Sequence, residues 1–127
     1  MKDTDMIGYV TLGSDDPAET ARFLGPILEG LGGRIAYELE QMIAWGFGDK
    51  RPLVMVTRPH DGGPASTGNG SMIALLAPDR AAVDRLHALA LATGGTDEGA
   101  PGPRGTGFYA AYFRSPEGHK FALVKMG

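Results

Sequence analysis

The sequence contains no cysteine and no long run of apolar residues. The missing cysteine excludes disulfides, cysteine zinc sites and thiol nucleophiles. Because no apolar run approaches about 20 residues and no apolar leader stands at the N-terminus, we expect neither a membrane span nor a secretory signal. Basic residues are also in the minority, since 12 lysines and arginines stand against 15 acids for a net charge of −3. Nucleic acid needs a basic surface. We therefore expect a cytoplasmic protein that binds neither nucleic acid nor membranes.

Glycine is abundant, at 20 of 127 residues, against an average share of about 7%. Many of these glycines gather in two clusters, 62–70 and 94–107, and the segments outside the clusters are periodic. A chain of this length with 43% hydrophobic residues can bury the core of one domain. The glycines therefore mark turns and helix ends in a folded protein.

The first half of the chain predicts one strand, one helix and three further strands. Asp16 followed by Pro17 is typical of a helix start, and Gly32-Gly33 is typical of a helix end. Pro26 lies inside this helix, so we expect a kink or a split near Gly25. The predicted strands are 7–12, 34–39, 42–47 and 53–58.

The second half repeats this order. Asp79 predicts the start of the second helix, and the Gly/Pro-rich stretch 96–106 predicts an irregular edge rather than a regular strand. The predicted strands are 72–76, 108–114 and 120–125. An offset of 63 residues relates Tyr9 to Met72 and Asp16 to Asp79, and it grows to 67 from Trp45 to Tyr112 and 68 from Val54 to Ala122. A repeat of this kind decides the architecture, which we predict to be α+β with two tandem βαβββ modules.

Several local sequences in the second half resemble one family. They are Asn69–Ala74, Ala77–Val83, Phe108–Phe113 and Ser115–Lys120. With the repeat, they resemble the vicinal oxygen chelate superfamily of glyoxalases, bleomycin-resistance proteins and extradiol dioxygenases, in its small bacterial glyoxalase-like branch. The resemblance implies a single domain over 1–127, with modules at about 6–58 and 70–127 and a linker at 59–69. It also implies a curled mixed sheet that bears a cleft, helices on the outside, and a homodimer.

In metal-using members, the resemblance implies ligands from the first and last strand of each module. Those places fall on Tyr9, Val54, Met72 and Ala122. A phenol with a pKa near 10 is a poor ligand at neutral pH, a thioether suits only soft ions, and alanine and valine offer no donor. We therefore predict no metal and no other cofactor. This argues against lactoylglutathione lyase and ring-cleaving dioxygenase activity, and leaves the metal-free binding of bleomycin-resistance-type proteins.

Strand alternation predicts which side chains face the cleft. If Val10 and Leu12 face the helices, then Tyr9 and Thr11 face the cleft, and the repeat adds Met72 and Ala74. Aromatic residues of the neighbouring strands either face the cleft or belong to the core or a dimer contact. Arg104 stands in a loop that would suit a carboxylate or phosphate, or is a solvated surface charge. The candidate ligand-binding residues are Tyr9, Thr11, Trp45, Phe47, Met72, Ala74, Arg104, Tyr112 and Ala122.

Three functions remain open. The first is a metal-free protein that binds and sequesters, or gives resistance to, a small apolar or aromatic compound. The second is a glyoxalase-like lyase or isomerase acting on a carbonyl compound, with Tyr9 and His60 as catalytic proton-transfer groups. The third is a non-catalytic dimer scaffold. Of the other histidines, His87 is expected to bond between helix and sheet, and His119 to lie at the surface.

Overall fold

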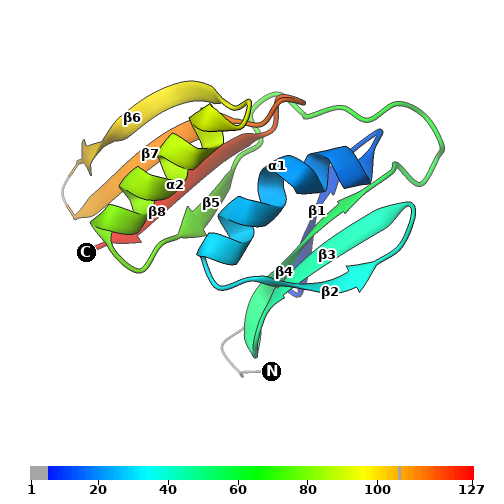
Figure 1. Cartoon of the computed structure of the whole chain (residues 1–127), viewed down its shortest axis with the longest axis horizontal. Coiled ribbons are helices and arrows are strands. Elements are labelled where there is room, and N and C mark those ends of the chain that lie inside the picture. The colour runs from blue at the N-terminus through cyan, green and yellow to red at the C-terminus, as the bar shows by residue number, and fades with distance from the viewer. Residues whose placement is uncertain (1–5, 106) are drawn as a thin grey trace. The chain divides into compact units, whose positions relative to one another are not determined.

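The computed structural model describes residues 6–105 and 107–127, and the chain divides after Thr67 into two units. Each unit consists of a strand, a helix and three strands, as the repeat predicts (Figure 1). The first comprises β1 (Tyr9–Gly13), α1 (Pro17–Gly30), β2 (Arg34–Glu38), β3 (Met42–Phe47) and β4 (Lys50–Thr57). The second comprises β5 (Ile73–Leu76), α2 (Arg80–Ala92), β6 (Thr96–Arg104), β7 (Phe108–Arg114) and β8 (Lys120–Met126). The α+β fold class with two tandem modules is confirmed.

The two sheets have the same topology. Their strand orders are β1-β4-β3-β2 and β5-β8-β7-β6. The first strand of each unit runs parallel to the last, and the other neighbours are antiparallel. The first two strands of each unit stand at opposite edges of their sheet, so the helix that connects them crosses the sheet and packs on one face (Figure 1). No helix in the described part of the chain is both long and apolar enough to cross a membrane.

The helix ends follow their sequence signals. Asp16 accepts a hydrogen bond from the Glu19 amide at 3.3 Å, and Asp79 accepts one from the Ala82 amide at 2.8 Å. Both helices then end in a Schellman motif, in which the second glycine donates its amide to a carbonyl five residues back. Gly33 donates to Leu28 at 2.9 Å, and Gly95 donates to the alanine at position 90 at 2.8 Å.

Of the kink or split expected in the first helix, the split is wrong, because α1 runs without a break through Pro26. A proline removes one helical hydrogen bond, here the one that the Arg22 carbonyl would accept. Pro26 and Arg22 both lie on the exposed side of the helix, where water can satisfy that carbonyl.

The glycine-rich stretch of the second unit is more regular than predicted. It forms β6, a nine-residue strand at the edge of its sheet. Its pairing with β7 shifts register between Asp97 and Gly99 and again between Gly99 and Gly102. The expectation of an irregular edge is therefore confirmed by the two register shifts, although the stretch is one continuous strand. Thr106, at the end of the stretch, lies outside the described residues.

In each unit, one sheet face carries the helix, and we call the other the open face. In the first unit, Val10 and Leu12 pair with the buried Val54 and Val56 on the helix-covered face. The open face of each sheet presents large exposed apolar side chains. They include Tyr9 and Tyr37 in the first unit and Leu76 and Met126 in the second.

Candidate functional site

The open face of the first unit carries two of the candidate residues. Tyr9 is 62% exposed, and Thr11 is also exposed. Both lie on β1, with side chains on the face opposite to that of Val10. Thr11 pairs with Met55 of β4, which pairs with Ala44 of β3. This face is therefore made of a phenol, a hydroxyl and apolar side chains, as the alternation of β1 predicts.

Val54 does not belong to this face. It pairs with Val10, is 4% exposed, and lies on the side of the sheet that α1 covers. Its neighbour Met55 stands on the open face instead. The assignment of Val54 to a family ligand position is therefore wrong by one residue, and a shift of one residue in a strand moves a side chain to the other face.

Trp45 also lies on the helix-covered face, in register with Val54. Its side chain is fully buried, and a Cβ added at Gly25 of α1 would lie 3.6 Å from the indole. Phe47 is directed to the same side, where its ring lies against Gly33 at the end of α1. The structure places neither ring on the open face with Tyr9 and Thr11. Trp45 belongs to the core, and Phe47 is half-buried against the end of α1.

The two candidate catalytic residues lie on different elements. Tyr9 pairs with Leu53, in the middle of β4 (Lys50–Thr57). His60 stands three residues beyond the end of β4 and is exposed. Their joint action on one substrate stays a prediction.

The open face of the second unit carries the remaining candidates. Ala74 is exposed on β5, Leu76 beside it is 70% exposed, and Met72 is exposed just before the strand. Ala122 pairs with Ala74 but is fully buried, because it belongs to a small cluster against which Tyr112 packs. A ligand on this face would therefore touch Ala74 and the ring of Tyr112 before it touched Ala122.

Arg104 is not a loop residue as predicted, because it is the last residue of β6 and is half-buried. Its guanidinium carbon lies 5.5 Å from the centre of the Tyr112 ring, within range of a cation–π interaction. A Cβ added at Gly99 would lie 2.8 Å from that ring and 3.4 Å from the guanidinium. Glycine at this position therefore leaves the space in which Arg104 and Tyr112 meet.

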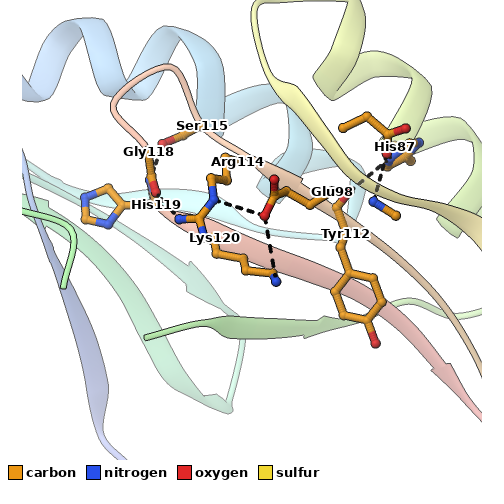
Figure 2. Close-up of polar contacts among 10 residues, drawn as sticks. His87, Glu98, Tyr112, Arg114, Ser115, Gly118, His119 and Lys120 are labelled. Carbon is orange, nitrogen blue, oxygen red and sulfur yellow. Dashed lines mark hydrogen bonds and ion pairs between the residues drawn. The ribbon is translucent and has the colours of Figure 1, made fainter. Parts of the chain in front are cut away.

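Two further cations lie beside Tyr112 and share one carboxylate (Figure 2). Glu98 Oε1 lies 3.1 Å from Arg114 Nε and 3.8 Å from Lys120 Nζ. Lys120 Nζ is also 5.7 Å from the centre of the Tyr112 ring. Sequence analysis missed this group. The alternation of β7 and β8 could have placed Arg114 and Lys120 on one face, but Glu98 arrives there through the register shift of β6.

Polar contacts of α2 belong to the structure of the unit rather than to the open face. His87 is buried, and its Nε2 lies 3.2 Å from both Asp97 Oδ1 and the carbonyl oxygen of Tyr112 (Figure 2). It joins the helix to β6 and β7, as expected. The surface position expected for His119 is wrong, because that residue is buried and its amide donates to Ser115 Oγ at 3.1 Å.

The hydroxyl of Tyr109 is paired with a carboxylate of α2, and this affects its pKa. Its hydroxyl donates a hydrogen bond to Asp84 Oδ1 at 2.6 Å. This bond raises the pKa of Tyr109 above 10.0, with smaller contributions from desolvation and the Asp84 charge, while Arg80 and Arg104 lower it. Tyr109 therefore stays protonated at neutral pH and is a poor general base.

Removing the acceptor tests this cause. In Asp84→Asn we expect Tyr109 to ionise at lower pH than in the unchanged protein, because a neutral amide favours the phenol less than a carboxylate does. The ultraviolet absorbance of phenolate, followed against pH, measures the shift, and Tyr109→Phe identifies the contribution of this tyrosine. An unchanged titration in Asp84→Asn would contradict the assignment.

A family model describes nearly the whole chain. The Glyoxalase/Bleomycin resistance protein/Dioxygenase superfamily matches residues 6–123. The chain belongs to this superfamily. No curated protein sequence matches it significantly.

Solved structures of this superfamily share the fold. A glyoxalase/bleomycin resistance protein from Albidiferax ferrireducens is 29% identical with a TM-score of 0.84, over 97% of this chain and 100% of that one. A glyoxalase-related enzyme from Fulvimarina pelagi is 21% identical with a TM-score of 0.75, over 95% and 88%. A lactoylglutathione lyase from Agrobacterium tumefaciens is 21% identical with a TM-score of 0.70, over 95% and 93%. The last two likenesses support the fold alone.

The metal that some superfamily members use does not suit the donors of this chain. On β1, β4, β5 and β8, the open faces offer a phenol, two threonine hydroxyls and methionine thioethers as donors, with no imidazole or carboxylate. Among the described residues, no group of three histidines, aspartates or glutamates lies close enough to hold an ion. Hard divalent ions prefer carboxylate and imidazole ligands. The side chains at the superfamily's ligand positions therefore do not fit such an ion.

Proposed function

We propose that this superfamily member binds a small, largely apolar or aromatic molecule on the open faces of its sheets, without a metal ion, and thereby sequesters it. The observation that carries the proposal is the character of these faces. Tyr9 and Leu76 are more than half exposed, whereas the other side of their strands is half-buried at Val10 and Leu12 and buried at Leu75. Small-molecule sites are mostly apolar with a few placed polar groups, and such faces supply that combination.

The donor chemistry favours binding over catalysis. Tyr9 is the candidate proton-transfer group on an open face, and His60 lies in the exposed loop that follows β4. A lyase or isomerase acting on a carbonyl compound needs a base within hydrogen-bond reach of the proton that it removes. Neither β1 nor β4 carries an imidazole or a carboxylate beside Tyr9, which leaves the enzyme alternative without a paired acid and base on these strands.

A thermal-shift screen tests the proposal. Aromatic acids, aldehydes, glutathione adducts and drugs are compared, because a ligand at about 100 times its Kd stabilises a protein by about 2.7 kcal/mol. We expect hits whose stabilising effect falls in Ala74→Gln, since the longer side chain occupies the open face. Ala88→Gln, on the exposed side of α2, is the matched control and should keep the full effect.

Two outcomes would contradict the proposal. If no compound stabilises the protein, binding is refuted and the dimer-scaffold alternative is favoured. If a hit is converted to product, and Tyr9→Phe abolishes turnover while binding persists, the protein is an enzyme and sequestration is refuted.

A further inference from the structure

The group around Tyr112 carries more positive than negative charge. Three cations, Arg104, Arg114 and Lys120, lie on the open face beside this ring, and Glu98 is the carboxylate that pairs with two of them. Among the ion pairs found in the described structure, none includes Arg104. Two positive charges are therefore in excess around one half-buried aromatic side chain.

Arg104 is held in place by carbonyl groups rather than by an acid. Its Nη2 donates to the Ala100 carbonyl at 2.7 Å, and its Nη1 donates to the carbonyls of Gly102 at 2.9 Å and Pro103 at 3.3 Å. A guanidinium has five N–H groups, and three of them are used by these bonds. Carbonyl oxygens fix the position of the guanidinium without neutralising its charge, so Arg104 keeps a positive charge beside Tyr112.

Lys120 lies where the charged group meets the apolar surface. Its Nζ is 3.8 Å from Glu98 and 5.7 Å from the Tyr112 ring. A partly exposed ion pair at this distance contributes little energy, so the ammonium remains available. In the pairing of β5 with β8, Ile73 lies beside Phe121, which places Met72 and the exposed Ala74 next to the end of β8 where Lys120 stands.

We propose that the open face of the second unit contains an anion subsite at Lys120, beside Tyr112, that selects small organic acids. The acidic group contacts the ammonium, Arg104 from the opposite neighbouring strand adds positive charge, and the apolar body lies on Ala74 and Leu76. This inference rests on the proposed binding function and names the class of ligand. Glu98 competes with the ligand, because its carboxylate already lies against Lys120 and Arg114.

Two dyes of nearly the same shape separate charge from apolar contact. 8-Anilinonaphthalene-1-sulfonate carries an anionic group on an aromatic body, and N-phenyl-1-naphthylamine is its neutral counterpart. Both are titrated by fluorescence at low ionic strength, because salt screens exposed charges. We expect Lys120→Gln to raise the Kd of the anionic dye about three- to tenfold and to leave the Kd of the neutral dye unchanged.

Lys125→Gln is the matched control. Lys125 stands on the same strand, pairs with Tyr109 on the opposite face, and carries the same charge. Lys125→Gln should leave the Kd of both dyes unchanged. Glu98→Gln should lower the Kd of the anionic dye about two- to fivefold, because this change removes the carboxylate that pairs with Lys120 and Arg114.

The outcomes distinguish the inference from the function on which it rests. If the neutral dye binds but Lys120→Gln and Lys125→Gln affect the anionic dye equally, or neither affects it, the anion subsite is refuted and the apolar binding function stands. If neither dye binds to the folded protein, both are refuted. Weaker binding of the anionic dye by Glu98→Gln would also contradict the competition between Glu98 and the ligand.

Discussion

Replacing Trp45 with alanine is expected to lower the free energy of unfolding by about 3–5 kcal/mol. The side chain is fully buried on the helix-covered face of the first sheet, and its indole lies against Gly25 of α1. Alanine would leave a cavity that the surrounding strands and helix fill only in part. Urea denaturation followed by circular dichroism measures the change, because Trp45 is the single tryptophan and its fluorescence is lost in the variant.

Trp45→Phe separates the effect of lost packing from the effect of the indole Nε1 group. Trp45 Nε1 is buried and has no hydrogen-bond partner among the described residues. Phenylalanine removes this unsatisfied donor, which offsets part of the lost packing, so we expect a loss of less than about 2 kcal/mol. Trp45→Phe should also leave the binding of both dyes unchanged, since the indole is not on an open face. Weaker dye binding in a fully folded Trp45→Phe would show that Trp45 contacts the ligand after all.

Gly95→Ala is expected to destabilise the second unit by about 2–3 kcal/mol. A Cβ at this position would lie 2.8 Å from the Ala90 carbonyl oxygen and 3.1 Å from the Arg114 carbonyl oxygen. Both are backbone atoms, one in the last turn of α2 and one at the end of β7, so neither can rotate away. The same contact would disturb the Schellman bond from Gly95 to Ala90. Thermal and urea unfolding measure the loss.

Gly8→Ala is the matched control for this change. A Cβ at Gly8 would meet nothing within 4 Å, so alanine there should leave stability unchanged or raise it by less than about 1 kcal/mol through a less flexible unfolded chain. Equal destabilisation by Gly95→Ala and Gly8→Ala would show that steric contact with the backbone is not the cause.

The repeat illustrates how far sequence comparison reaches. The offset of 63 residues places Asp16 and Asp79 correctly as helix caps, and both make the expected bonds. Beyond the helices, the offset between matching positions changes. Thr11 and Ala74 correspond by the offset of 63. Thr11 pairs with Met55, and Ala74 pairs with Ala122. The residue that corresponds to Ala122 is therefore Met55, and Val54 is one residue away from it.

The candidate site shows the same limit. Tyr9, Thr11 and Ala74 are found on open faces because their strands alternate regularly. Trp45 and Tyr112 appear equivalent in the sequence, yet the first lies under α1 and the second lies on an open face. Register shifts between Trp45 and Phe47 and between Asp97 and Gly99 add residues to one strand of a pair. Such shifts change which face a side chain occupies, and composition does not mark them.

The sequence by itself determined the fold class, the repeat, the helix starts and the family, because caps, glycines and periodicity are local signals. It also determined that the family's ligand positions lack good metal donors, since residue identity limits coordination chemistry. Only the tertiary structure decided that Trp45 belongs to the core and that Val54 lies on the helix-covered face. It alone brought Arg104, Lys120 and Glu98 to one ring. These contacts join different strands through irregular register, and pairing between distant segments depends on how the whole sheet packs.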